Sequence, residues 1–211
     1  YDLPPGAERP ATLPRAVTFG PPEVVILDLP QLRDDVPAHL PLIAATAKPW
    51  PGALAVYRSP GSDGFELLTT VRRRANLGRL ASDLWPAPTS RLDMGNVLII
   101  DLASGQLESV SDLALFGGAN AMAVESAPGR WEIVQAADAE LIAPGRYRLT
   151  RLLRGQRGTE HAMGHPTPTG ARVVLLNEAL TPLPIPEADL GIPINRRIGP
   201  ARPPVISDPF T

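Results

Sequence analysis

Short apolar runs, separated by turns rich in proline and glycine, recur along the chain and predict β-strands rather than long helices. Two of these runs, residues 52–58 and 65–72, flank the segment Ser-Pro-Gly-Ser-Asp-Gly and predict a β-hairpin. Residues 42–47 and 96–102 predict two further strands. Residues 24–29 predict another, and because this run is continuously apolar we expect it to be covered on both faces.

The second half of the chain continues the pattern as a meander. Proline-glycine pairs at residues 128–129 and 144–145 suit type II turns between strands. The predicted strands are residues 122–126, 131–136, 139–143 and 146–153, followed by a last strand at residues 172–177.

One hairpin of this series, residues 131–153, is expected to organise the core. Alternation along a strand puts Arg146 and Arg148 on a solvated face and the residues between them on the opposite face. We expect its buried contributors to include Ile133, Leu141, Tyr147 and Leu149.

Helical structure is expected only in short turns. Ser111 or Asp112 can accept a hydrogen bond from a free N–H group of a first turn, which predicts a short helix over residues 113–116. The glycines at residues 117–118 would end that helix, and residues 106–110 before it predict a returning strand.

Proline is the most unusual feature of the composition, with 26 among 211 residues, more than twice the usual share of about 5 %. Because proline lacks an N–H donor and fixes φ, it interrupts helices and central strands. We therefore expect a mainly β fold of one or two small barrel- or sandwich-like antiparallel units with proline-rich extended ends. The expected parts are an extended entry segment at residues 1–22, a β-rich module at residues 23–180 with a candidate break near residues 75–93, and an extended linker or strap at residues 181–211.

Charge and composition disfavour several classes of function. A net charge of −2 gives no long-range attraction for polyanions, so no nucleic-acid partner is expected. The chain has no cysteine, which excludes disulfides and thiolate metal sites. No apolar run approaches about 18 residues, so no membrane span is expected. Because the sequence starts with Tyr1 and not with methionine, we expect the chain to be part of a longer protein.

The histidines do not predict a metal site or a catalytic triad. His161 and His165 have the spacing of a helical metal pair, but glycine and proline surround them and no third histidine or cysteine is near. His39 has no Gly-x-Ser-x-Gly segment to join. We predict no metal and no cofactor.

Paired carboxylates are the other candidates for chemistry. Sugar hydrolysis needs two acids that face each other across about 5–9.5 Å, whereas isolated acids on a strand surface are commoner. The glycine pairs at residues 117–118 and 155–158 lack the lysine and hydroxyl residue of a phosphate loop. The acids considered are Asp34 with Asp35, and the group Glu132, Asp138 and Glu140. No catalytic residue is predicted, and the chain is not expected to be an enzyme.

Arginines and tryptophans offer contact sites. Arg154 and Arg157, the last two of a cluster with Arg146, Arg148 and Arg151, are candidate structural or intersubunit contacts. Their planar forks could clamp backbone carbonyls of the chain itself, or carboxylates of a neighbouring subunit. If exposed and clustered, the tryptophans could instead form a platform for stacking sugars, and otherwise they pack in a core or at its rim; they are Trp50, Trp85 and Trp131.

The arginine cluster leads into a segment that resembles a known family. Leu152 to Thr159 reads Leu-Leu-Arg-Gly-Gln-Arg-Gly-Thr and resembles the corresponding part of phage-type tail tip proteins, where such a motif follows a hairpin. Further similar segments occur in the expected order, at residues 50–59, 94–98, 107–113, 118–121, 172–179, 188–191 and 197–201. Residues 48–201 together resemble the C-terminal region of the large tail hub proteins, often labelled host specificity proteins, of alphaproteobacterial gene transfer agents and related siphophages.

The resemblance implies a structural module of a tail-tip baseplate hub that acts through protein–protein contacts. Its implied partners are other tail hub and tail-tip proteins in a ring, expected to be a trimer, in a virion tail assembled in the bacterial cytoplasm. The glycoside-hydrolase-like barrel of such relatives has no counterpart here, so its activity is not transferred. A module at the tail tip that binds a host receptor or glycan is the first alternative, and a peptidoglycan-processing enzyme fragment is the second. Exposed, clustered tryptophans would favour the former, and two acids facing each other in a cleft would favour the latter.

Overall fold

The computed structural model of the protein describes residues 19–37 and 39–201. Most of the predicted entry segment at residues 1–22, and residues 202–211 of the predicted strap, lie outside the described residues. Strands dominate the described part, so the expectation of a mainly β fold is confirmed. Its helical structure consists of α1 (Asp112–Phe116) and the 3-10 turns Gln156–Gly158, Glu160–Ala162 and Glu187–Asp189. No helix in this part of the chain is long and apolar enough to cross a membrane.

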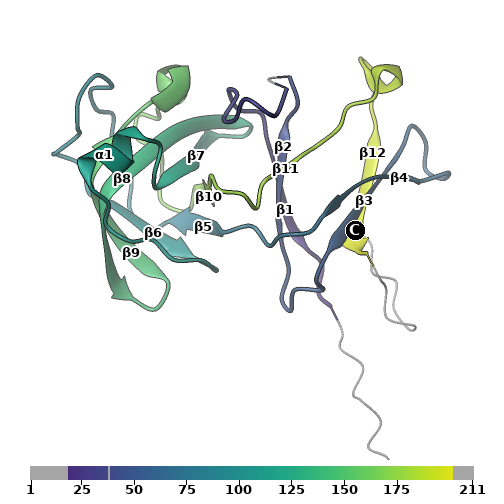
Figure 1. Ribbon diagram of the computed structural model, residues 1–211, viewed down its shortest axis with the longest axis horizontal. Helices are drawn as coiled ribbons and strands as arrows, with labels where there is room; N and C mark the ends of the chain where they lie inside the picture. Colours follow the sequence, from purple (N-terminus) through teal and green to yellow (C-terminus); the bar gives the residue numbers. More distant parts are fainter. Residues whose placement is uncertain (1–18, 38, 202–211) are drawn as a thin grey trace, which may run out of the picture.

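A closed antiparallel barrel forms the largest unit (Figure 1). Around the barrel the strands follow the order β10-β5-β6-β9-β8-β7, so each of them is paired on both sides and none is a free edge. Aliphatic side chains fill the interior, among them Leu98, Ile100, Met122 and Leu149. The strands are β5 (Leu77–Leu80), β6 (Leu98–Leu102), β7 (Ala121–Ala127), β8 (Arg130–Ala143), β9 (Arg146–Leu153) and β10 (Arg172–Leu175).

The long strand β8 joins two sides of the barrel. Its first part pairs with β7, and from Gln135 onward it pairs with β9. The sequence predicted two strands here, residues 131–136 and 139–143, and that break is wrong, because 14 residues continue as one strand while the neighbour changes.

The same strand explains a second error. Leu141, predicted to be buried, is 60 % exposed, because the last residues of β8 are all exposed where the β8–β9 hairpin ends.

A central sheet lies between the barrel and a third, outer sheet (Figure 1). The central sheet has the order β1-β2-β11, and its strands are β1 (Glu23–Leu27), β2 (Leu42–Thr46) and β11 (Thr181–Pro182). The outer sheet has the order β12-β3-β4, and its strands are β3 (Leu54–Ser59), β4 (Glu66–Val71) and β12 (Asn195–Pro200). The predicted hairpin at residues 52–72 is thereby confirmed as the antiparallel pair β3–β4.

Successive side chains of β2 in the central sheet point to opposite faces and pack in two different hydrophobic cores. Ala44 packs with Trp131 and Ile133 in the core between this sheet and the outside of the barrel. Its neighbours Ile43 and Ala45 point to the other side and pack with residues of the outer sheet. Both faces of β2 are therefore covered. For residues 24–29 the prediction of two covered faces is wrong, because Ile26 and Asp28 on one face are exposed, Ile26 at 44 %.

In the sequence, the barrel is inserted between the strands β1 to β4 and the strands β11 and β12, which together form the two smaller sheets. After the last barrel strand the chain returns, and Thr181 and Pro182 pair with β2. Residues 195–200 then pair along the whole of β3. The described part of the predicted linker or strap thus crosses both small sheets and completes each of them.

The short helix was predicted correctly, whereas the strand predicted in the segment before it was not. Of the two predicted caps, Ser111 and Asp112, it is Ser111 that caps α1, because its hydroxyl accepts a hydrogen bond from the Ala114 N–H at 3.3 Å. Gly117 ends the helix, also as predicted. The strand predicted at residues 106–110 is absent from this described segment, whose backbone pairs with the barrel only locally, through the Val110 N–H and the Ala137 carbonyl at 2.8 Å.

Candidate functional site

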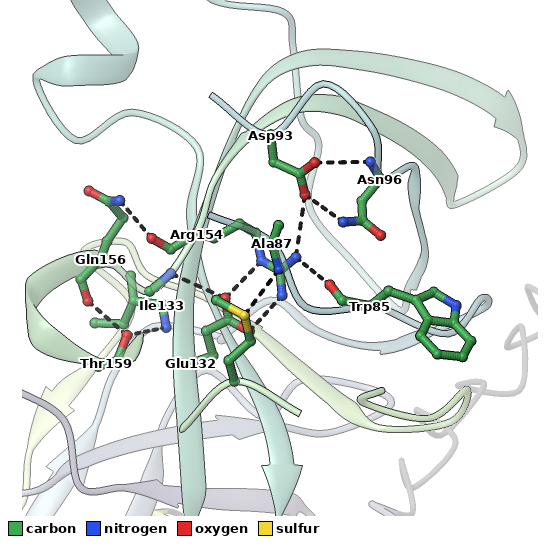
Figure 2. Close-up of polar contacts among 11 residues, drawn as sticks. Trp85, Ala87, Asp93, Asn96, Glu132, Ile133, Arg154, Gln156 and Thr159 are labelled. Atoms are coloured by element: carbon green, nitrogen blue, oxygen red, sulfur yellow. Dashed lines mark hydrogen bonds and ion pairs between the residues drawn. The ribbon is translucent and has the colours of Figure 1, made fainter. Parts of the chain in front are cut away.

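Arg154 lies fully buried directly after β9, and its guanidinium joins several segments of the barrel (Figure 2). Its Nε and Nη2 donate to the two carboxylate oxygens of Glu132 on β8, at 2.8 and 3.0 Å. Its Nη1 donates to the Trp85 carbonyl at 2.7 Å and to Asp93 Oδ2 at 3.4 Å. Glu132 is also fully buried and accepts from the Gly155 N–H at 3.1 Å. Because a buried charge needs partners on every side, these bonds lock β8, the end of β9 and the loop before β6 together.

Asp93 attaches that loop to the cluster. One carboxylate oxygen accepts from the backbone N–H groups of Gly95 and Asn96, each at 3.0 Å, and the other accepts from the Asn96 side chain at 2.7 Å. Its backbone exchanges two hydrogen bonds with Leu152, at 2.8 and 3.0 Å. Burial alone would raise the pKa of Asp93, but the hydrogen bonds from Asn96 and Gly95 and the charge of Arg154 outweigh it and hold that pKa below its ordinary value.

The turn after Arg154 is fixed by glycines and by Thr159. Gly155 and Gly158 have φ angles of 57° and 80°, in the left-handed region that favours glycine. A Cβ atom on Gly155 would lie 2.8 Å from the Cα of Glu160, so no larger residue fits. The Thr159 hydroxyl donates to the Gln156 carbonyl at 2.7 Å and accepts from the Ile133 N–H at 2.8 Å. These positions of the Leu152–Thr159 motif build the end of the barrel.

Arg157 behaves differently from Arg154. It is exposed, and it has a φ of 56° although it is not a glycine. Its Nη1 donates to the Gln31 carbonyl, in the loop between β1 and β2, at 3.1 Å. No carboxylate among the described residues pairs with it. The two arginines selected from the sequence therefore differ in their roles. Arg154 pairs with acids of its own chain, whereas Arg157 lies at the surface.

A groove of about 1020 Å³ lies beside Arg157, where the barrel meets the central sheet. Its lining comes from the loop at residues 29–40, from β7 and β8, from the end of α1 and from residues 176–182. Leu29 and Leu180 in this lining are buried, whereas Phe116 is 67 % exposed. Such junctions between packed units are where ligand sites occur most often.

Four of the five acids considered for catalysis, all except Asp34, are held in ion pairs. The shortest distances are 2.8 Å from Glu132 to Arg154, 3.3 Å from Asp138 to Arg151 and 3.4 Å from Glu140 to Arg148. Asp35 accepts from Arg33 Nε at 2.9 Å. The Nδ1 atom of His161 lies 2.9 Å from the Gly158 carbonyl oxygen. No three His, Cys, Asp or Glu side chains gather into a metal site within residues 19–37 and 39–201.

The tryptophans belong to different parts of the molecule. Trp131 is buried in the core between barrel and central sheet, and Trp50 packs partly buried against the core of the outer sheet. Only Trp85 of the three is largely exposed, at 57 %. The fold does not bring the three rings into one sugar-stacking platform.

Neither acidic partner of Arg154 was predicted as such from the sequence, because Glu132 was considered only for catalysis and Asp93 was not considered. Glu132 stands between Trp131 and Ile133 in an apolar strand, and an acid in that setting needs a buried cation. Asp93 begins the segment Asp-Met-Gly-Asn, which is typical of a turn closed by an aspartate side chain. Both signals were readable, but their meeting at Arg154 depends on a separation of 61 residues that only the fold brings together.

Comparison with known families points to the barrel. A family model described as Rcc01698-like, C-terminal, matches residues 75–174, a little under half of the 211 residues. The match begins just before β5 and ends within β10, so it coincides with the closed barrel and leaves the two small sheets outside. No curated protein matches the chain. The barrel is thus the part that is similar to this family.

The ion pairs predict how stability depends on pH. The pKa values of Asp93, Glu125 and Asp101 lie below their ordinary values, for the last two chiefly because Arg172 and Arg146 donate to them. A lowered folded-state pKa contributes stability that is complete above the unfolded-state pKa and is lost as the pH falls through the folded-state pKa. We therefore expect a flat melting temperature near neutrality and a steep fall below about pH 4. Circular dichroism melts across this range test it, and an unchanged melting temperature at low pH would contradict it.

Proposed function

We propose that this chain is a structural module of a tail-tip baseplate hub in a phage-like particle of the gene-transfer-agent type, and that it acts through protein–protein contacts. One observation carries the proposal. The Leu152–Thr159 motif, on which the resemblance to tail hub proteins centres, folds into a buried, ion-paired turn at the end of the barrel. Arg154 and the Gly155 N–H of this motif neutralise and bind the buried carboxylate of Glu132 on β8, which is a structural use of these groups, as a scaffold requires.

The state of the acids supports the same proposal. A general acid or base needs a carboxylate that is free to exchange a proton with a substrate. Glu132, Asp138 and Glu140 are each paired with an arginine instead. That the chain has no enzymatic activity remains a prediction, and turnover of peptidoglycan that depends on a single acid would contradict it.

The test is a cryo-electron microscopy reconstruction of particles that carry the parent protein. We expect density for the six-stranded barrel and its two sheets within a ring at the end of the tail tube, with three copies related by symmetry. Particles made with the barrel residues 75–174 deleted should lack tail tips. Density for the module elsewhere in the particle would refute the proposed location, and a single copy at the tip would refute the ring.

A second function, recognition of a host receptor or glycan at the tail tip, has one supporting observation, the exposure of Trp85, although the three tryptophans do not cluster. Aromatic rings of this kind stack on ligands and dominate contact surfaces. Replacing Trp85 with alanine distinguishes the two functions, because the Trp85 backbone carbonyl, which Arg154 uses, is retained. A structural module keeps normal adsorption of particles to host cells, whereas a receptor-binding module loses adsorption while tail tips still assemble.

A further inference from the structure

Arg157 combines a strained backbone with an unneutralised charge. At a φ of 56° it adopts a conformation that is unfavourable for every residue with a side chain except, to a degree, asparagine and aspartate. Glycines stand on both sides of it in the motif, at residues 155 and 158, and a third glycine would relieve the strain. Residues held in such strained conformations cluster at active sites, ligand clamps and switch regions.

The charges along the groove leave Arg157 as the available cation. The groove is lined by three arginines, Arg33, Arg73 and Arg157, and by one acid, Glu178. Arg33 is occupied by Asp35, and Arg73 by Glu178. Arg157 uses one N–H for the Gln31 carbonyl, so the rest of its fork is available for an incoming carboxylate. On a chain with a net charge of −2, this groove has a local positive excess.

The remaining lining suits a peptide better than a sugar or a small ion. Leu29, Leu180 and the exposed ring of Phe116 offer apolar contacts. Gln135, only 6 % exposed, donates both amide hydrogens inward, to the Leu115 and Ala119 carbonyls at 2.7 and 2.9 Å. Gln135 lines the groove, and no described residue donates to its Oε1. The volume of about 1020 Å³ is at the upper end of the range for ligand pockets.

We infer that this groove binds an extended acidic segment of a partner protein. A carboxylate of the segment pairs with the Arg157 fork, flanking aliphatic side chains pack against Leu29, Leu180 and Phe116, and a backbone N–H of the segment donates to Gln135. The inference rests on the proposed function in one respect, since it gives the hub module a defined protein contact.

The experiment starts with the 211-residue chain as it is and a displayed library of random short peptides. We expect selection of peptides with aspartate or glutamate between aliphatic residues. A synthetic peptide of the selected sequence is then compared, by fluorescence polarisation, with its counterpart carrying asparagine or glutamine instead of the acid. Arg157→Gln should weaken binding of the acidic peptide by about tenfold, the loss of one charge-assisted pair, and should not change binding of the amide peptide.

Two further variants separate binding from folding. Arg91→Gln, at an exposed arginine outside the groove, is the matched control and should bind like the unchanged protein. Arg157→Gly should keep or raise the melting temperature, because glycine relieves the left-handed conformation, and should lose the acidic peptide as Arg157→Gln does. A fall in melting temperature together with unchanged peptide binding would overturn the inference.

The other outcomes are equally decisive. Selection of peptides without acids, no selection at all, or equal binding by the Arg157→Gln variant would each refute an acidic peptide as the occupant. Dimers in light scattering that Arg157→Gln abolishes would assign the groove to a second copy of the chain and also refute it. Peptide binding without density at the tail tip would refute the proposed function alone, and tip density without peptide binding would refute the groove alone.

Discussion

Replacing Arg154 with methionine should lower the free energy of unfolding by about 3–5 kcal/mol, which is among the largest effects expected of a single substitution in this chain. The variant leaves the fully buried carboxylate of Glu132 without its cation, and it leaves the Trp85 carbonyl without its donor. Methionine keeps much of the volume, so the loss reports charge rather than a cavity. Denaturant melts of the purified chain measure it.

Arg148→Met is the matched control for this prediction. Arg148 lies on β9, the strand that Arg154 directly follows, and pairs with Glu140 at 3.4 Å, but both side chains are about half exposed. A surface pair contributes at most about 1 kcal/mol, so the control should change little. The double variant Arg154→Met with Glu132→Met should regain part of the loss, since the buried charge disappears with its partner. Equal losses for Arg154→Met and Arg148→Met would show that the cluster does not stabilise the fold.

Leu149→Ala should lower the free energy of unfolding by about 2–5 kcal/mol. Leu149 is completely buried inside the barrel, with Leu98 opposite it on β6 and Ala139 opposite it on β8. Because the closed barrel is held by hydrogen bonds on every strand, it cannot collapse around the missing methyl groups, which places the loss in the upper part of that range.

Leu141→Ala in the same hairpin is the comparison for Leu149→Ala. Leu141 is 60 % exposed, so its truncation should change stability by no more than about 0.5 kcal/mol. The two leucines have the same chemistry and lie eight positions apart in neighbouring strands, and only their burial differs. A loss under about 0.5 kcal/mol for Leu149→Ala would show that the core lies elsewhere.

Features that depend on residues close together in the sequence could be predicted from local sequence patterns. The β3–β4 hairpin, the alternation of Tyr147 and Leu149 against Arg146 and Arg148, and the Ser111 cap were all predictable, because each depends on residues a few positions apart. Leu141 shows the limit of that reasoning. Its alternation is correct, but burial requires an opposing layer, and the position of that layer is a property of the whole fold.

Long-range closure could not be predicted in the same way. The identity of the strand beside each barrel strand depends on pairings between distant segments, such as β10 with β5 and β7. The candidate site shows the same difference between local and long-range features. Arg154 and Arg157 were selected from a local cluster, whereas the acids that neutralise Arg154 and the groove beside Arg157 are produced by segments that meet only after folding.

The insertion of the barrel between β4 and β11 has a mechanical consequence. The first and last strands of the described chain, β1 and β12, both belong to the small sheets, so tension applied at those two strands passes through the central and outer sheets. The barrel segment lies outside that path along the chain, and from the C-terminal side β12 must separate from β3 and β11 from β2 before the chain of the barrel is pulled directly. A chain of this design can be stretched between neighbours while the barrel surface keeps its shape.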